Sequence, residues 1–259
     1  MQKIRVIVSG CNGRMGQVIT RMCGETEDME IVAGLDCNTE RRNGYPVFAD
    51  PMECQIKADV LIDFSNASLL DRLLPYCVQN RLPAVICTTG HTPEQLEALK
   101  KASEQVPMFR SGNMSLGINL LTNLLKKAAA VLGNGFDVEI IEKHHHTKVD
   151  APSGTAIMLA DAVSEGLSYE PEYVYERQSV RRQRGKTEIG ISAVRGGTIV
   201  GEHEVMFCGQ DEVVTFRHTA YSREVFANGA VTAARFLAKV AEPGMYDMND
   251  ALAEILQKL

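Results

Sequence analysis

The sequence predicts an α/β protein with a doubly wound parallel sheet, joined to a second, α+β domain with a mixed or antiparallel sheet. The first half alternates short β-branched segments with segments whose apolar residues recur at helical spacing. This alternation is typical of parallel strands joined by right-handed helical crossovers. The second half changes to longer β-branched segments separated by glycine-containing turns, which indicates a different architecture.

In the first half we expect five strands, at residues 3–9, 30–36, 59–64, 84–87 and 107–110. Helices should separate them. The first has apolar residues at helical spacing from Met15 and ends near Gly24, the second spans 65–80, and the third begins with Thr92 as N-cap and Pro93 as its first residue. In a sheet of this kind, ligands bind at the carboxyl ends of the strands.

In the second half we expect helices at 118–132, 153–165 with Ser153 as N-cap, 226–240 and 250–259, and a strand at 136–143. The segment 187–221 reads as an antiparallel meander. We therefore predict a nucleotide-binding domain at residues 1–115 and an inserted domain at residues 116–222. The helices of residues 223–259 are expected to return to the first domain.

The composition excludes several classes of protein. Of the 259 residues, 45% are hydrophobic and 23% are charged, which is enough apolar content for a core and argues against disorder. The net charge of −6 argues against a nucleic-acid partner. The apolar runs are far shorter than the ~20 residues of a membrane span, and the N-terminal segment lacks a signal-peptide pattern. We therefore expect a cytoplasmic protein without a membrane partner.

The cysteines and the basic run give no sign of a functional site. Seven cysteines without a C-x-x-C spacing predict reduced thiols, and neither a disulfide framework nor a zinc site. The basic run at residues 177–186 is expected to be a solvated loop face.

A glycine-rich turn follows the first strand, in the order Gly10, Cys11, Asn12, Gly13, Arg14, Met15, Gly16. Glycine permits a tight turn and close approach of a pyrophosphate to backbone N–H groups, and the following helix start favours an anion. Asp36, at the end of the second strand, is suited to the ribose hydroxyls of an adenine dinucleotide. The alternative is that these glycines only make a turn.

The choice between NADH and NADPH stays open. A carboxylate at Asp36 repels a 2′-phosphate and favours NADH, whereas the nearby Arg41 and Arg42 are able to bind one. Thr88 and Thr89, with Gly90, follow the fourth strand and are expected near the nicotinamide ribose. Turn chemistry alone is the alternative for this tripeptide.

The segment from Glu142 to Ala156 concentrates three histidines, a lysine and a Pro-Ser-Gly-Thr turn that opens a helix. The free N–H groups of Gly154 and Thr155, with Lys148 nearby, predict a carboxylate-binding site. A histidine beside them supplies a proton donor that titrates near neutrality. Two alternatives remain: a metal site at His144 and His146, for which no third ligand is evident, and a surface histidine run without chemistry.

This segment resembles the E-x-H-H-x-x-K-x-D-A-P-S-G-T-A signature of the dihydrodipicolinate reductase family of bacterial lysine biosynthesis. The resemblance extends along nearly the whole chain, in order. It includes the glycine-rich turn, Asp63-Phe64-Ser65, Thr88-Thr89-Gly90, Asn113-Met114-Ser115, Val200-Gly201-Glu202-His203 and Phe226-Ala227-Asn228-Gly229-Ala230.

The resemblance implies a Rossmann-like first domain and a substrate domain that mediates a homotetramer. It implies reduction of a cyclic 2,6-dicarboxylate by NADH or NADPH, with no metal. His144 would be the acid/base and Lys148 the second catalytic residue. His145, Gly154 and Thr155 would bind a substrate carboxylate. The cofactor would contact Gly10, Cys11, Asn12, Gly13, Arg14, Met15, Gly16, Asp36, Cys87, Thr88, Thr89, Ser111, Asn113 and Met114.

Two departures from the family pattern are visible. Cys37 stands where some members carry an arginine, which weakens the case for 2′-phosphate recognition. Cys87 stands where a glycine is common, which leaves the detail of the nicotinamide contact open.

Overall fold

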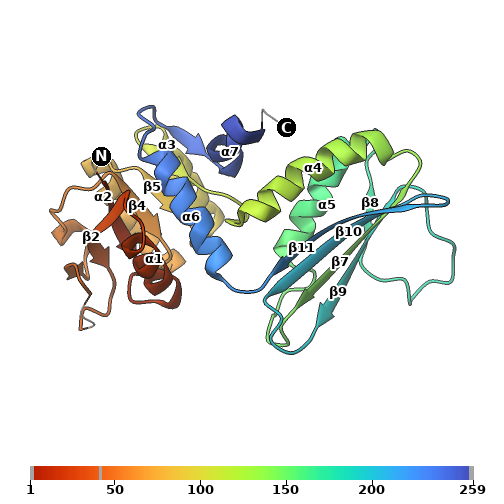
Figure 1. The fold of residues 1–259 in the computed structure, drawn as a ribbon, viewed down its shortest axis with the longest axis horizontal. Coiled ribbons are helices and arrows are strands. Elements are labelled where there is room, and N and C mark those ends of the chain that lie inside the picture. Colours follow the sequence, from red (N-terminus) through yellow and green to blue (C-terminus); the bar gives the residue numbers. More distant parts are fainter. Residues whose placement is uncertain (1–2, 41–42, 257–259) are drawn as a thin grey trace. The chain divides into compact units, whose positions relative to one another are not determined.

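The computed structural model describes residues 3–40 and 43–256, and the chain divides into two units (Figure 1). The first unit combines Met1–Met114 with Glu224–Leu259, and the second is Ser115–Arg223. Arg41 and Arg42 lie outside the described residues, so their expected role toward a 2′-phosphate stays a prediction.

The first unit contains a seven-stranded sheet in the order β12-β6-β5-β4-β1-β2-β3, with every neighbouring pair parallel. Its strands are β1 (Ile4–Ser9), β2 (Met29–Leu35), β3 (Val47–Phe48), β4 (Val60–Asp63), β5 (Ala84–Ile86), β6 (Pro107–Phe109) and β12 (Gly244–Tyr246). The predicted doubly wound parallel sheet is thereby confirmed. The edge strands β3 and β12 were not predicted, because β3 has only two residues and β12 begins with a glycine, which is uncommon in strands.

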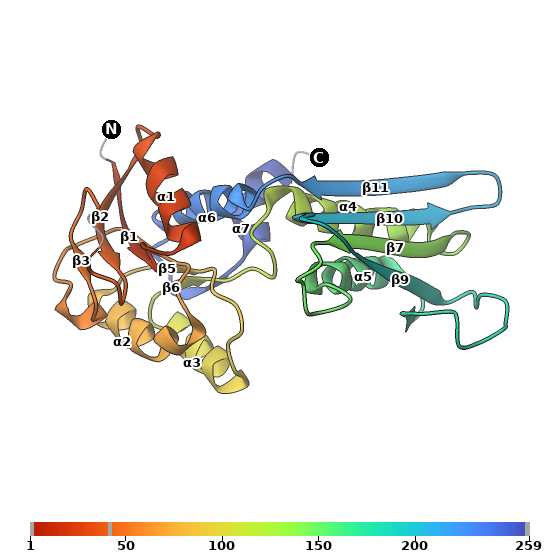
Figure 2. The ribbon, with the colours of Figure 1, turned by 90° about the horizontal axis from the view of Figure 1, so that it is seen from below.

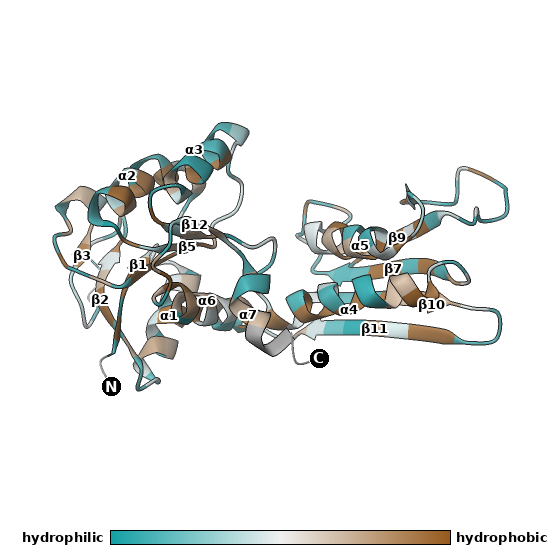
Figure 3. Ribbon diagram, turned by 90° about the horizontal axis from the view of Figure 1, so that it is seen from above, coloured by the Kyte–Doolittle hydropathy of each residue, from teal (hydrophilic) through white to brown (hydrophobic). Residues whose placement is uncertain are grey.

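Helices cover both faces of this sheet (Figure 3). On one face lie α1 (Arg14–Gly24), α6 (Glu224–Leu237) and α7 (Met248–Leu256), and on the other lie α2 (Leu70–Asn80) and α3 (Pro93–Ser103), with short 3-10 turns at Pro51–Glu53 and Ala67–Leu69. The strands between them are buried on both sides, so they read as continuous apolar runs. Helix α3 starts with a capping box in which Thr92 and Gln95 bond each other's backbone N–H groups.

The second unit contains a five-stranded mixed sheet in the order β11-β10-β7-β9-β8. Its elements are α4 (Leu116–Leu132), β7 (Asp137–His144), α5 (Gly154–Gly166), β8 (Glu172–Val174), β9 (Glu188–Arg195), β10 (Gly201–Cys208) and β11 (Val213–Ala220). Helices α4 and α5 pack on one face of the sheet (Figure 2).

The expected antiparallel meander over 187–221 is wrong in its first half. Strands β10 and β11 do form an antiparallel hairpin, but β9 is parallel to β7, which lies between β9 and β10. The Gly196–Gly197 turn is not a hairpin turn. Instead it passes the end of β7, where the Gly196 N–H bonds to the His144 carbonyl and the His146 N–H bonds to the Gly197 carbonyl.

The covered face of the second sheet changes character along its strands. Val138 and Ile140 of β7 and Phe207 of β10 pack against the helices as an apolar cluster. Two residues further along β7, the same face carries Glu142 and then His144, because side chains in a strand alternate between faces. The apolar core therefore ends in a buried polar group at one end of the sheet.

The basic loop at residues 177–186 is largely exposed, as the sequence predicts, but its arginines also pair with acidic side chains of the sheet. The guanidinium of Arg184 donates to Asp137 at 2.8 Å and to Glu139 at 3.0 Å, and Arg177 pairs with the buried carboxylate of Glu188. Within the described residues, no helix is long and apolar enough to cross a membrane.

Candidate active site

The glycine-rich turn lies between β1 and α1. Gly10 has φ +74°, and a Cβ there would lie 2.5 Å from the Phe64 carbonyl oxygen, while a Cβ at Gly16 would lie 2.1 Å from the Gly10 oxygen. Both positions therefore require glycine for the turn and for packing of the helix. Around Gly13, the nearest atom to an added Cβ is 3.2 Å away, so packing alone accounts for this glycine less well.

The start of α1 is suited to an anion. No side chain among the described residues caps it at Gly13, and no acidic residue lies in its first turn. Its first backbone N–H groups therefore have no capping side chain as acceptor, and they carry the positive end of the helix dipole. The residues present fit the pyrophosphate of a dinucleotide.

A cavity of about 540 Å³ adjoins this turn. Its lining residues come from the ends of β1, β2, β3 and β4 and the segments that follow them, with the start of α2: Gly10, Asn12, Gly13, Leu35, Asp36, Cys37, Asn38, Ala49, Phe64, Ser65, Asn66, Ser68, Leu69 and Arg72. Asp36 accepts hydrogen bonds of 2.9 Å from the N–H groups of Asn12 and Asn38, which holds its carboxylate at the rim. The volume of this cavity is within the usual range of small-ligand pockets.

Not every residue of the turn faces this cavity. The Cys11 side chain is fully buried beside Gly34, and burial raises its pKa to about 11. The Cys11 side chain is therefore outside the cavity lining, and the predicted contact with a cofactor would have to come from its backbone. Arg14 is exposed and Met15 is half-buried at the start of α1.

The predicted residues after β5 and β6 lie at the same edge of the sheet. Thr88 donates a 2.6 Å hydrogen bond to the buried carboxylate of Asp63, which also accepts from Ser65. Cys87, Thr88 and Thr89 line a second cavity of about 420 Å³ with Phe64–Ala67 and Gly90. Ser111, Asn113 and Met114 follow β6, where the Ser111 hydroxyl donates to the Asn113 carbonyl at 2.9 Å.

In the second unit, His144 is buried at the end of β7. Its Nδ1 lies 2.6 Å from Oε2 of Glu142, two residues earlier on the same face of the strand. Burial lowers the pKa of His144, and the positive charges of Lys148 and Arg195 add to this, against the raising effect of Glu142. The imidazole of His203 stacks edge-to-face on His144 with ring centroids 5.1 Å apart.

Glu142 is the centre of this group. Arg195 donates to both of its oxygens, at 2.8 and 2.7 Å, and the Ser153 N–H donates to Oε1 at 3.0 Å. Burial raises the pKa of Glu142, but the hydrogen bonds from Arg195 and His144 outweigh it and leave the pKa below its ordinary value. The carboxylate is therefore ionised and accepts all of these bonds.

Lys148 and the start of α5 share one partner. The Lys148 ammonium lies 2.8 Å from Oδ1 of Asp150, and the Gly154 N–H also bonds to Asp150. The hydrogen bond from Lys148 lowers the pKa of the Asp150 carboxyl. Two of the groups predicted to bind a carboxylate thus hold a carboxylate of the chain itself. Thr155 follows Gly154 in the first turn of α5.

The other two histidines of the run have separate partners. His145 Nδ1 lies 2.7 Å from the Thr147 hydroxyl, and His146 Nδ1 lies 2.9 Å from the Gly197 carbonyl. Over the described residues, no group of three or more metal-ligating side chains comes together. His145 and His146 line a shallow cavity of about 310 Å³ with Thr147, Gly197, Thr198, Val200 and Arg223.

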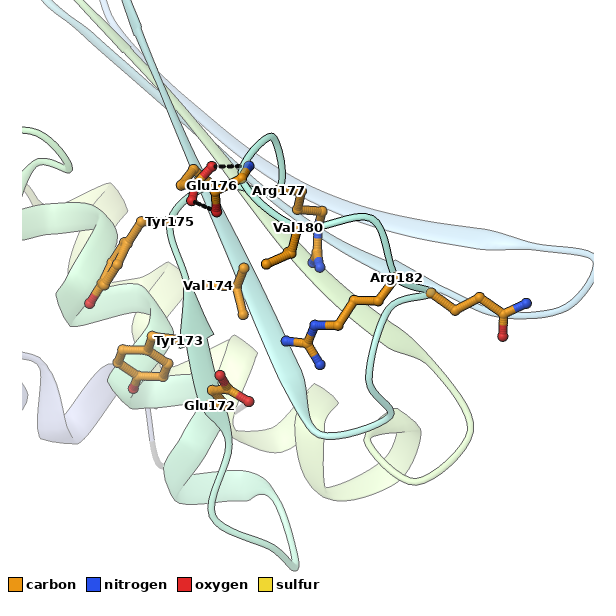
Figure 4. A pocket seen from close by; sticks show the side chains of 10 residues that line it. Glu172, Tyr173, Val174, Tyr175, Glu176, Arg177, Val180 and Arg182 are labelled. Carbon is orange, nitrogen blue, oxygen red and sulfur yellow. Dashed lines mark hydrogen bonds between the residues drawn. The ribbon is translucent and has the colours of Figure 1, made fainter.

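A further hollow of about 320 Å³ lies between β8 and the basic loop (Figure 4). Two of its arginines, Arg177 and Arg182, contact the buried carboxylate of Glu188. The positive charges of these arginines are neutralised by carboxylates of the protein, so this hollow offers little to an anionic ligand.

Several residues that build the site had no predicted role. Glu142 was part of the family signature, and Ser65 and His203 belonged to matching segments, but none was predicted to act. Arg195 and Arg72 carried no signal at all. Pairing of His144 with Arg195 and of Glu142 with His203 across neighbouring strands places these side chains together.

The fold and these two groups of residues are typical of oxidoreductases that pair a dinucleotide-binding α/β unit with a second unit carrying buried ionisable residues. The sequence matches both parts of one such family, the N-terminus of dihydrodipicolinate reductase at residues 4–114 and its C-terminus at residues 117–252. The chain belongs to the dihydrodipicolinate reductase family.

Individual relatives agree with this family. The chain is 51% identical over 247 residues to the 4-hydroxy-tetrahydrodipicolinate reductase of Caldanaerobacter subterraneus subsp. tengcongensis, covering 95% of this chain and 97% of the relative. It is 46% identical over 251 residues to that of Clostridium perfringens, covering 96% and 98%. Among solved structures, the dipicolinate-bound dihydrodipicolinate reductase from Paenisporosarcina sp. TG-14 superposes with a TM-score of 0.80 at 28% identity, covering 96% and 99%.

Proposed function

We propose that this protein reduces 4-hydroxy-tetrahydrodipicolinate, by way of dihydrodipicolinate, to tetrahydrodipicolinate with NADH or NADPH, in the diaminopimelate route of lysine biosynthesis. Family membership supports this reaction. The observation that carries it is the group at the end of β7. There a buried imidazole is held by a carboxylate, near a lysine and a helix start that both bind a carboxylate.

The first unit would hold the cofactor. The turn from Gly10 to Gly16 and the start of α1 fit a pyrophosphate, and Asp36, which lines the same cavity, would accept hydrogen bonds from ribose hydroxyls. Its negative charge favours NADH over NADPH. Cys87, Thr88, Thr89, Ser111, Asn113 and Met114 would surround the nicotinamide end.

The second unit would hold the substrate. Lys148, His145 and the N–H groups of Gly154 and Thr155 would bind a ring carboxylate, for which Asp150 would have to move aside. Lys148 would also stabilise negative charge that grows on the substrate. A doubly anionic substrate beside His144 would favour its imidazolium form, which burial in the free protein disfavours.

The proton chemistry falls to His144. A reduced nicotinamide, when bound, supplies the hydride that the reaction adds to C4 of the dehydrated substrate. The substrate then has an electron pair that must take up a proton. His144, whose Nδ1 is engaged by Glu142, would deliver or relay that proton from Nε2.

A coupled assay tests the function. The condensation product of pyruvate and aspartate semialdehyde is supplied, and the loss of NADH or NADPH absorbance is followed. We expect oxidation of at least one cofactor that depends on this substrate. Cofactor binding without turnover would identify a dinucleotide sensor, and turnover only with sugar or homoserine substrates would assign another reductase; either result would overturn the proposal.

We further propose a homotetramer formed through the second unit, with neither nucleic acid nor membrane as a partner. Helices α4 and α5 cover one face of its sheet, and no helix in the described part of this unit covers the other. Light scattering coupled to size-exclusion chromatography tests the stoichiometry, and a monomer at micromolar concentration would contradict it.

A further inference from the structure

A buried cluster of polar groups surrounds Glu142 in the second unit. Its side chain is completely buried, yet it receives two hydrogen bonds from Arg195, one from the Ser153 N–H and one from His144. A buried carboxylate is retained in a fold only when such partners compensate its lost hydration. Arg195 is itself fixed by a 2.6 Å bond to the Asp150 carbonyl.

We propose that Glu142 and Arg195 are positioning residues for the reaction: Glu142 fixes the tautomer and orientation of His144, and Arg195 limits how tightly the Glu142–His144 pair holds a proton. This inference rests on the proposed role of His144 as acid/base. It adds to that role two side chains that reach the reacting atoms only through His144.

The tautomer follows from the donors around Glu142. With two guanidinium N–H groups bonded to it, the carboxylate is ionised and only accepts, so His144 Nδ1 must be the donor. Neutral His144 therefore has a bare Nε2. The backbone beside that atom is Gly201, where a Cβ would lie 3.1 Å from Nε2. The glycine leaves room at the nitrogen that has to exchange a proton.

The charges that face His144 act in opposite directions. Glu142 favours the imidazolium, whereas Arg195 and Lys148 disfavour it, and the neighbouring His203 ring adds no compensating negative charge. Asp150 is engaged by Lys148. Removing Arg195 leaves an uncompensated buried carboxylate beside an imidazole. Whichever of the two then carries the proton, the pair keeps it to higher pH.

The test is a pH titration of the histidine ring resonances by NMR, in full-length protein with ring-labelled histidine, assigned with His144→Gln. We expect Glu142→Gln to lower the apparent pKa of His144 and Arg195→Met to raise it, each by about one unit, since a charge within ~4–6 Å shifts a pKa by 1–3 units. The double variant should return toward the wild-type value. In the wild type, the neutral ring should be protonated at Nδ1.

Arg184→Met is the matched control, because it breaks the same kind of ion pairs at the opposite end of β7. It should leave the His144 titration unchanged even where it lowers stability. If Arg195→Met does not fold, Arg195→Lys is the second variant, because it keeps the charge but loses the contact with both oxygens of Glu142. It should shift the pKa of His144 less than Arg195→Met, and it should hold Glu142, and through it the His144 ring, less firmly.

Shifts of the same sign in Glu142→Gln and Arg195→Met, or a wild-type ring protonated at Nε2, would overturn the inference. The titration needs no substrate, so it stands apart from the proposed function. If the reduction is also confirmed, the His144 limb of the kcat/KM profile should move in the same direction as the NMR pKa in each variant. A limb that stays in place would show that the pair does not serve the reaction.

Discussion

The backbone N–H of Ser153 donates a 3.0 Å hydrogen bond to Oε1 of Glu142, and this contact ties the start of α5 to the strand that carries His144. Ser153 is also the N-cap of that helix, accepting from the Ala156 N–H at 3.2 Å. The helix start proposed to bind a carboxylate and the imidazole proposed to move a proton are therefore built on the same few residues. A substitution at the start of α5 should therefore also change the position of the His144 imidazole, and the reverse.

Replacing His144 by glutamine should lower kcat by about 10²–10⁴-fold, the usual contribution of a general acid or base. The affinity for NADH should stay near that of the wild type, because the cofactor is proposed to bind the first unit. Steady-state kinetics and a fluorescence titration with NADH measure the two quantities. An unchanged kcat would remove His144 from the reaction.

Replacing Lys148 by alanine should impair both kcat and the KM for substrate. A hydrogen bond to a charged group contributes about 1.5–3 kcal/mol, so kcat/KM should fall by roughly 10–100-fold. Steady-state kinetics with each reactant varied in turn check this. A change confined to the KM for the cofactor would contradict the assignment of Lys148 to the substrate.

Asp150 holds the groups that we expect a substrate carboxylate to occupy. Asp150→Asn keeps the shape of the side chain and removes its charge, so an added dianion has less to displace. We expect dipicolinate to bind roughly two- to fivefold more tightly, because the carboxylate of this ion pair is exposed and such pairs contribute little. Calorimetric titration with dipicolinate measures this, and weaker binding would mean that Asp150 orients Lys148 for the ligand.

Much of the fold and part of the site could be predicted from the sequence, where the information is local. The turn beginning at Gly10, the capping of α3 by Thr92 and the N-cap at Ser153 depend on a few consecutive residues, and each was found. The parallel sheet of the first unit follows from alternating periodicities along the chain.

The missing parts depend on pairing between distant segments. Arg195 reaches Glu142 because β9 lies beside β7 in parallel register, and His203 reaches the His144 ring because β10 lies on the other side of β7. Glycine turns and β-branched runs do not specify which strands become neighbours, and so the predicted meander is wrong at β9 and right only for the β10–β11 hairpin. The same limitation hid the charges that neutralise the basic loop.

Asp36 should discriminate between the two cofactors. Asp36→Ala should weaken NADH more than NADPH, because it removes both an acceptor for ribose hydroxyls and a charge that repels a 2′-phosphate. Asp36→Asn is the matched variant, since it keeps an acceptor for the Asn12 and Asn38 N–H groups while losing the charge. Dissociation constants for both cofactors are compared, and equal losses would show that Asp36 does not contact the ribose.

His203 should make the stability of the protein depend on pH. Burial lowers its pKa to about 4 from the 6.5 of an exposed histidine, with a smaller contribution from His144. Above pH 6.5 the ring is neutral in both the folded and unfolded chains, so its stabilising contribution is fully present. As pH falls toward 4, the unfolded chain binds a proton that the folded chain resists, and stability decreases.

The loss from this one group should reach about 3 kcal/mol in the free energy of unfolding between pH 6.5 and pH 4. Denaturant unfolding at a series of pH values measures it in the wild type and in His203→Gln. Near neutral pH the variant should be less stable than the wild type, since the glutamine replaces the ring that contacts the Ser153 hydroxyl at 3.0 Å, and this difference should shrink or reverse toward pH 4. However, its slope against pH should be smaller by about one proton. Parallel slopes in the two proteins would mean that His203 does not resist protonation in the fold, and that other buried histidines carry the acid sensitivity.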